Sequence, residues 1–243
     1  MKHYDIHAHI GRTSSGEPYD ADMLIEQLAS FGISKVGICC LSGSDSNVQN
    51  DLVCDAMSRY PDIVKGYAFI NPKSPGVFDE IDFRLGDKKM NGVKFNSWKH
   101  GYFGENCPEI NDVLIAIKKY RVQIQVHVGT SPLCTPFPWV EYANKHKDLD
   151  FVFTHMGCHE FGWSTIEAIR NTPNIWVETS CQMEVEVLKK AFSDLGSKRI
   201  IFGTDWPYRP TNVEMEKIFL LGLTDMELED IFYKNAEILW RMN

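Results

Sequence analysis

The sequence lacks several features that would each indicate a particular class of protein. It contains no run of Lys and Arg, and its formal net charge at pH 7 is −8, which argues against non-specific binding to nucleic acid because such binding depends on a basic surface. It contains no apolar run of about 18 residues, the length that a membrane-spanning helix requires. No basic and apolar leader precedes the first predicted strand, so we expect a cytoplasmic protein without a membrane partner.

Cysteine is present, but its spacing indicates no cysteine-based site. The seven cysteines are odd in number, are irregularly spaced and include no Cys-x-x-Cys pair, which argues against both a thiolate zinc knuckle and a disulfide framework. No Gly-x-Gly-x-x-Gly sequence follows a predicted strand, so the usual signature of a dinucleotide-binding fold is missing as well. We therefore expect reduced thiols and a function carried by other residue types.

Strand-like and helix-like segments alternate along all 243 residues. Eight apolar segments recur at intervals of roughly 25–30 residues, as expected for successive β-α units. The predicted strands are Tyr4–Ile10, Lys35–Leu41, Val64–Ile70, Gly92–Asn96, Val122–Val128, Asp150–His155, Ile175–Thr179 and Arg199–Gly203. We predict a single-domain (β/α)8 TIM barrel over residues 1–243, without an N-terminal β-sandwich, and an open doubly wound sheet is the alternative.

Helical patterns occupy the intervals between these strands. The predicted helices are Asp20–Phe31, Asn47–Tyr60, Pro75–Lys89, Pro108–Tyr120, one starting near Pro138, Ser164–Asn171, Val185–Leu195 and the helices after Asn212. A Gly/Ser/Asp loop is expected at 42–46 and a glycine- and aromatic-rich loop at 97–106.

Polar residues collect at the C-terminal ends of the predicted strands, where barrel enzymes build their active sites. Because side chains alternate along a strand, His7 and His9 point the same way, with Asp5 deeper in the barrel interior. By the same alternation Lys94 and His127 point inward from later strands, and His155 and Asp205 end or follow two others. Each alone is more often structural, but imidazoles at three strand ends plus one carboxylate form the ligand set of a Zn²⁺, Mn²⁺ or Fe²⁺ site.

Five short motifs then indicate a family. Asp-Ile-His-Ala-His-Ile, Gly-Val-Lys-Phe, Val-His-Val-Gly, Thr-His-Met-Gly and Phe-Gly-Thr-Asp-Trp-Pro occur in this order along the chain. Together they resemble the amidohydrolase superfamily, and more narrowly its amidohydrolase 2 branch, which holds aminocarboxymuconate-semialdehyde decarboxylase-like proteins and TIM-barrel metal-dependent hydrolases. The C-terminal Asn-Ala and its trailing apolar residues are also similar to that branch.

The resemblance implies roles for individual residues. His7, His9, His127 and Asp205 would bind a divalent metal, most simply Zn²⁺, and His155 would assist proton transfer near the substrate. Lys94 is ambiguous, because in binuclear relatives a carboxylated lysine at this position bridges two ions, with His155 as a ligand of the second. A single ion and an unmodified Lys94 that contacts substrate or a polar neighbour are preferred here.

The predicted reaction is hydrolysis of an amide, ester or lactone in a small, carboxylated molecule. The ion would activate water, and Asp205 would accept the water's proton and deliver it to the leaving group. Arg209 and Trp98 are candidates for substrate binding, together with Lys94. The alternatives are non-oxidative decarboxylation at the same site and, less favoured, a barrel that binds metal or metabolite without turnover. A homodimer is compatible with the many aromatic residues.

Overall fold

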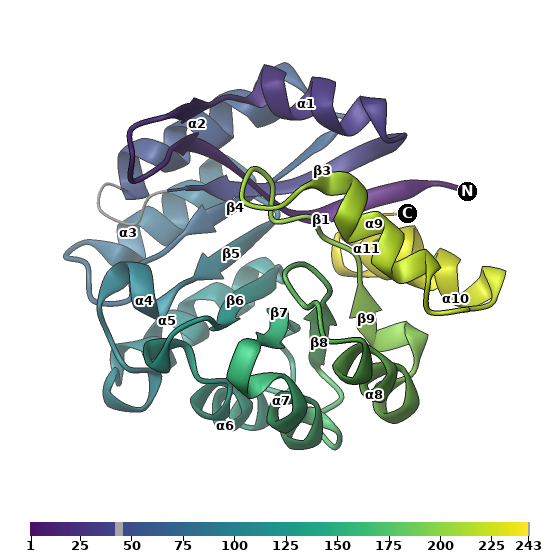
Figure 1. The fold of residues 1–243 in the computed structure, drawn as a ribbon. Coiled ribbons are helices and arrows are strands. Elements are labelled where there is room, and N and C mark those ends of the chain that lie inside the picture. The colour runs from purple at the N-terminus through teal and green to yellow at the C-terminus, as the bar shows by residue number, and fades with distance from the viewer. Residues whose placement is uncertain (42–45, 243) are drawn as a thin grey trace.

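A computed structural model, which describes residues 1–41 and 46–242, contains a parallel sheet closed into a barrel (Figure 1). Its strand order is β2-β1-β3-β4-β5-β6-β7-β8-β9, and only β2 runs antiparallel to its neighbour. The bounds are β1 His3–Arg12, β2 Pro18–Tyr19, β3 Ile33–Cys40, β4 Val64–Phe69, β5 Gly92–Phe95, β6 Gln123–Gly129, β7 Phe151–Cys158, β8 Ile175–Glu178 and β9 Ile200–Ile201.

The segment after β9 closes the barrel onto β1. The Ile6 amide donates to the Phe202 carbonyl at 3.1 Å, and the Asp205 amide donates to the His7 carbonyl at 2.7 Å. This closure confirms the predicted barrel class and excludes the open doubly wound sheet. It also brings the aspartate that follows β9 beside the histidines of β1.

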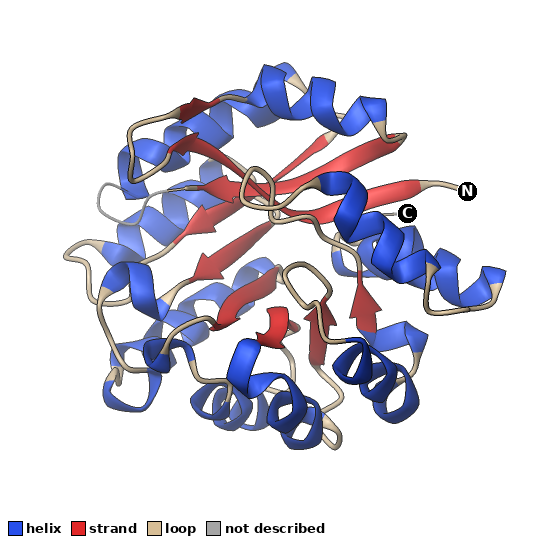
Figure 2. Cartoon of the chain, viewed as in Figure 1, coloured by secondary structure: helices blue, strands red, loops and turns tan. Residues whose placement is uncertain are grey.

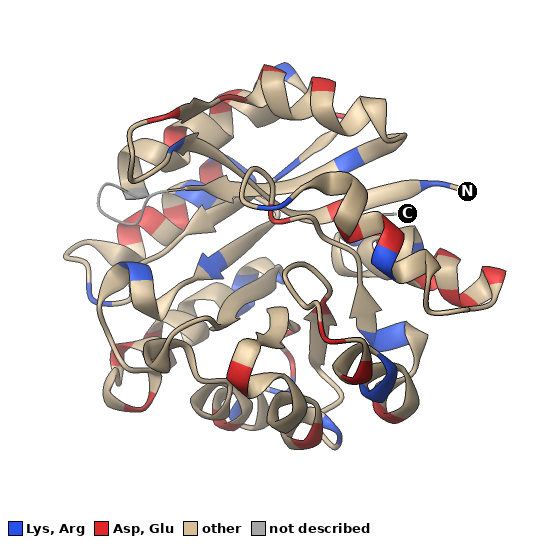
Figure 3. Ribbon diagram, in the orientation of Figure 1, with Lys and Arg blue, Asp and Glu red and all other residues tan. Residues whose placement is uncertain are grey.

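Helices surround the strands, as Figure 2 shows. They are α1 Ala21–Ser30, α2 Ser46–Arg59, α3 Val77–Ile81, α4 Ser97–His100, α5 Glu109–Ile117, α6 Phe137–Lys145, α7 Gly162–Ile169, α8 Val185–Leu195, α9 Thr211–Phe219, α10 Asp225–Glu229 and α11 Asn235–Leu239. Among the described residues, no helix combines the length and the apolar character needed to cross a membrane. Figure 3 shows Lys and Arg interspersed with Asp and Glu on these outer helices.

Local side-chain chemistry explains several helix boundaries. The Asp20 carboxylate accepts from the Met23 amide at 2.9 Å and caps α1, and Gly32 with φ +69° lets the chain leave that helix. The Asn96 side chain caps α4 through the Lys99 amide. This single turn lies within the segment predicted as a loop.

Two predicted elements differ clearly from the structure, and a third prediction lies mostly outside the described residues. The helix predicted at 75–89 is α3 followed by a π-helical segment, Asp82–Asp87. The strand predicted at 199–203 is reduced to Ile200–Ile201, because the Phe202 amide donates to the Ile231 carbonyl at 3.0 Å instead of to a neighbouring strand. Of the loop predicted at 42–46, residues 42–45 lie outside the described residues, and Ser46 begins α2.

The first strand does not alternate strictly. Its pairing with β3 shifts between Asp5 and Ala8, as at a β-bulge. Ala8 and Ile10 pack in the large core cluster with the helices. Ile6, which strict alternation would place with them, instead packs in a smaller cluster that contains Tyr4, Cys39, Tyr67, Val152, Ile201, Ala236, Leu239 and Trp240. The bulge thus separates the floor of the barrel from the residues that carry the site.

Candidate metal centre

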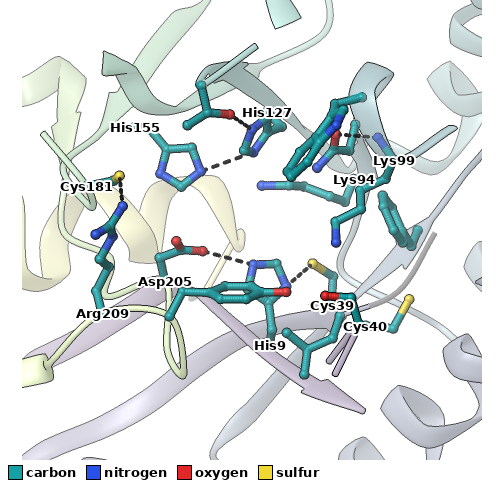
Figure 4. A pocket seen from close by; sticks show the side chains of 17 residues that line it. His9, Cys39, Cys40, Lys94, Lys99, His127, His155, Cys181, Asp205 and Arg209 are labelled. Carbon is teal, nitrogen blue, oxygen red and sulfur yellow. Dashed lines mark hydrogen bonds and ion pairs between the residues drawn. The ribbon is translucent and has the colours of Figure 1, made fainter. Parts of the chain in front are cut away.

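The residues singled out in the sequence meet at the C-terminal end of the barrel. A cavity of about 360 Å³ opens there, and its lining includes His9, Lys94, His127, His155 and Asp205 (Figure 4). His7 lies beneath this lining and is 1 % exposed. Strands β1, β5, β6 and β7 and the segment after β9 each contribute at least one of these side chains, as the barrel topology predicts.

His7, His9 and Asp205 form one compact donor group. Their ligand atoms all lie within 4.8 Å of one another. Asp205 Oδ1 is 3.1 Å from His9 Nε2 and 3.7 Å from His7 Nε2. Two imidazole nitrogens and one carboxylate oxygen at this spacing fit a divalent ion of the Zn²⁺, Mn²⁺ or Fe²⁺ type, with room for further ligands.

His127 and His155 form a second pair in the same cavity. His155 Nε2 lies 3.1 Å from His127 Nδ1, and the other nitrogen of His127 contacts Thr130 Oγ1 at 2.8 Å. Within the described ranges, the donor group of His7, His9 and Asp205 does not include His127. The structure therefore brings His127 into the site but pairs it with His155.

Lys94 lies directly against the first group. Its Nζ is 3.0 Å from His7 Nε2 and 3.1 Å from Thr154 Oγ1. Burial lowers the pKa of this amine, because a charged ammonium loses its hydration inside the barrel. The contact with His7 Nε2 places Lys94 where an ion held by this nitrogen would be its immediate neighbour.

Glu178, which sequence reasoning did not identify, anchors the site from below. Its carboxylate lies 2.9 Å from His7 Nδ1, and it accepts from Ser180 Oγ at 2.8 Å and from the His155 amide at 3.2 Å. Burial raises its pKa to about 8. Its position in the sequence could have identified it, because Glu178 lies at the end of an apolar strand, as several of the candidate histidines do.

Three of the four imidazoles have pKa values that favour the neutral form, which is the form that binds a cation. Burial lowers the pKa values of His7, His127 and His155 well below the usual range, and neighbouring positive groups add to this effect. For His9, burial acts in the same direction, but Cys39 and Asp205 outweigh it and raise the pKa to about 10. Cys39 Sγ lies 3.1 Å from His9 Nδ1. A metal bound by His9 would therefore displace a proton.

The predicted substrate-binding residues all line the cavity. Lys94, Trp98 and Arg209 are joined there by Lys99, which lies over the Trp98 ring at 5.3 Å. Arg209 Nη2 donates to Cys181 Sγ at 2.9 Å, and its buried Nε has no hydrogen-bond partner among the described residues. The wall thus presents three cationic side chains to whatever enters.

Comparison with known proteins places the chain in a family. A family model described as amidohydrolase matches residues 4–242, and no curated protein matches the chain. Several solved structures share the fold and match the whole of this chain, among them the three that follow. One is a dihydroxybenzoic acid decarboxylase from Polaromonas sp. JS666 with bound manganese and an inhibitor, with 14% identity, 98% of its own chain covered and a TM-score of 0.77.

The second similar structure is a probable 2-pyrone-4,6-dicarboxylic acid hydrolase from Acinetobacter baumannii with bound citric acid (16% identity, 100% of its chain, TM-score 0.77). The third is an amidohydrolase from Burkholderia multivorans (12% identity, 100% of its chain, TM-score 0.78). Manganese in a neighbour and the His/His/Asp group here support a divalent metal, and the family match supports an enzyme. The chain belongs to the amidohydrolase family of the Amidohydro_2 type.

Proposed function

We propose that this protein is a metal-dependent hydrolase that cleaves an amide, ester or lactone bond in a small, carboxylated molecule. The observation that carries the proposal is the group of His7, His9 and Asp205 at the mouth of the barrel, facing a cavity with cationic side chains in its wall. A divalent ion held by this group would polarise a carbonyl and lower the pKa of nearby water toward ~7. We favour Zn²⁺, and the donor set also accepts Mn²⁺ or Fe²⁺.

Side chains of the protein would carry out the proton transfer and stabilise the developing charge. Asp205 is close enough to the imidazoles to accept a proton from attacking water and to return it to a leaving group. His155 faces the cavity and is held by Ser180 Oγ at 3.0 Å, so its other nitrogen is directed toward His127 and the substrate space. His155 would stabilise negative charge that develops on the substrate or share in the proton transfer.

One ion is preferred over two. Three donors surround a single position beside His7 and His9, whereas no group of potential ligands among the described residues contains both His127 and His155. A bridging role for Lys94, whose amine lies 3.0 Å from His7 Nε2, would also require its carboxylation. An unmodified Lys94 contacts polar neighbours and the cavity, where it can bind a substrate carboxylate together with Arg209. His127 would complete the ion's surroundings from across the cavity.

Non-oxidative decarboxylation is the second candidate, because a solved neighbour is a dihydroxybenzoic acid decarboxylase. The test is a library of two substrate classes, small carboxylic acids that contain an amide, ester or lactone and hydroxybenzoic acids, incubated with metal-loaded protein in oxygen-18-labelled water. We expect label in the product and no CO₂. CO₂ release without label would overturn the hydrolase and support the decarboxylase.

Asp205→Asn is the accompanying variant, with Asp148→Asn as its matched control. Asp148 forms an exposed ion pair with Lys118 at 2.8 Å, outside the cavity. We expect the Asp205 variant to lose activity by at least about 100-fold, because a single acid–base group contributes 10²–10⁴-fold, and the control to keep it. A wild-type protein that binds metal but turns over no member of either substrate class would favour the non-catalytic alternative.

A further inference from the structure

Two cysteines lie close together at the wall of the cavity, and neither belongs to the group of His7, His9 and Asp205. Cys158 ends β7, and Cys181 lies in the segment after β8, the adjacent strand. Their sulfur atoms lie within 4.8 Å of each other, in one group with the exposed His159. Cys181 lines the cavity, whereas Cys158 is fully buried behind it.

Of the two sulfurs, Arg209 contacts that of Cys181 and thereby favours its thiolate form. Its Nη2 donates to Cys181 Sγ at 2.9 Å, and Figure 4 shows the two side chains together at one edge of the cavity. A guanidinium in contact with a sulfur stabilises the thiolate form. The pKa of Cys181 is lowered by the Cys158 thiol, which pairs with it, and by Arg209, whereas the pKa of Cys158 is raised.

We propose that Cys181 and Cys158 are a peroxide-reactive pair in which Cys181 is the attacking thiolate and Cys158 closes a disulfide. The assignment follows from position: the sulfur that faces the cavity also contacts Arg209, and the partner sulfur is in reach behind it. The modification site is independent of the metal-dependent reaction, since it requires only peroxide and the two thiols.

The chemistry balances with hydrogen peroxide as the oxidant. The Cys181 thiolate attacks one peroxide oxygen, the O–O bond breaks, and the departing hydroxide takes up a proton to become water. The resulting sulfenic acid is attacked by Cys158, so the S–S bond forms, the S–O bond breaks and a second water leaves. Two thiols lose two electrons in total, and one peroxide is reduced to two waters.

Disulfide formation would also change the cavity wall. A disulfide sulfur carries no negative charge, so the charge-assisted contact between Arg209 and Cys181 would end. The guanidinium, whose Nε already lacks a partner among the described residues, would then present its full charge to the cavity. Oxidation would thus alter the electrostatics of the wall without touching His7, His9 or Asp205.

The experiment uses the reduced, full-length protein and an equimolar to small excess of hydrogen peroxide. We expect the thiol count to fall from the seven cysteines of the sequence by two, and peptide mapping without reductant to identify Cys158 joined to Cys181. Reductant should restore both thiols. In Cys158→Ser, a sulfenic acid should accumulate on Cys181 and be trapped by dimedone.

Arg209→Gln tests the origin of the reactivity. We expect Cys181 to be oxidised roughly 10-fold more slowly in this variant, because a hydrogen bond from a charged group, which contributes about 1.5 kcal/mol, is lost. Arg170→Gln is the matched control, because Arg170 pairs with Asp194 on the outer surface, and Cys134→Ser should leave the disulfide unchanged.

Three results would overturn the proposal. The first is that all thiols survive peroxide, and the second is that another cysteine pair forms the disulfide. The third is that Cys158 and Cys181 react only after treatment with a chelator, which would make them, with His159, ligands of a thiophilic ion.

Discussion

Glu178→Gln should weaken metal binding without touching a metal ligand directly. Glu178 is buried and accepts from Ser180 Oγ at 2.8 Å and from the His155 amide at 3.2 Å, while His7 Nδ1 lies 2.9 Å away. A carboxylate that accepts the Nδ1 proton keeps Nε2 of His7 free for the ion and raises the basicity of the ring. These three groups all reach Glu178 Oε2, and the Ser180 amide donates to Oε1. A glutamine has one acceptor oxygen and one amide NH₂, so in either orientation at least one of the four donors would face another donor.

The expected loss follows from the kind of contact that is removed. Carboxylates that orient a ligating histidine typically contribute 10- to 100-fold in metal affinity, which corresponds to about 1.4–2.7 kcal/mol. We expect the Kd for Mn²⁺ or Zn²⁺ to rise by this factor in Glu178→Gln, as measured by competition with a chelating dye. The unfolding free energy should fall as well, by about 1–3 kcal/mol, because a buried donor is left unsatisfied.

Glu214→Gln separates the two effects. Glu214 is equally buried and pairs with Lys217 and with the Cys181 amide, and neither contact involves a histidine. This variant should lose stability while its metal Kd stays within about twofold of wild type. If folded Glu178→Gln binds metal as tightly as wild type, the role assigned to Glu178 is wrong.

Three further predictions address the substrate wall, the backbone and the pH dependence of stability. Arg209→Gln should lower kcat/KM for carboxylated substrates by about 10- to 100-fold, as expected for a lost charge-assisted hydrogen bond, and leave neutral analogues unaffected; equal losses for both would refute the clamp. Gly157→Ala should lower the unfolding free energy more than Gly76→Ala, as measured by urea denaturation, although both glycines have φ near +72°. A Cβ at Gly157 would lie 2.1 Å from Thr165 Oγ1, whereas no described atom lies within 4 Å of a Cβ at Gly76. Burial lowers the pKa of His146 from 6.5, so the unfolded chain takes up the proton first as the pH falls below 6.5, and the free energy of unfolding decreases there. His146→Asn should reduce the dependence of the unfolding free energy on pH in this range by up to about 1.4 kcal/mol per pH unit. An unchanged pH dependence would contradict this prediction.

Much of the framework was predictable because it depends on repeating patterns. Alternation of β and α segments predicted the barrel, and the location of active sites at the C-terminal strand ends predicted that His7, His9 and Asp205 would converge. The order of strands in a closed parallel barrel is enough to bring these three residues to the same end. The hydrogen bonds that close the barrel between the segment after β9 and β1 then set the distances.

What the sequence did not reveal depends on side-chain direction and on local irregularity. The bulge in β1 breaks the strict alternation that would place Ile6 with Ala8 and Ile10. Glu178 and Cys39 each contact a histidine nitrogen that faces away from the proposed ion, and no spacing rule predicts such contacts between distant strands. For the same reason, the pairing of His127 with His155 became visible only in three dimensions.

The most direct test of the account is the metal content of the protein. Wild type and the double variant His9→Asn/Asp205→Asn would be loaded with Mn²⁺ or Zn²⁺, dialysed and measured by inductively coupled plasma mass spectrometry. We expect one ion per chain in wild type and none in the variant. A wild-type protein without bound metal would contradict the central claim, and two ions per chain would contradict the single-ion site and indicate a carboxylated Lys94.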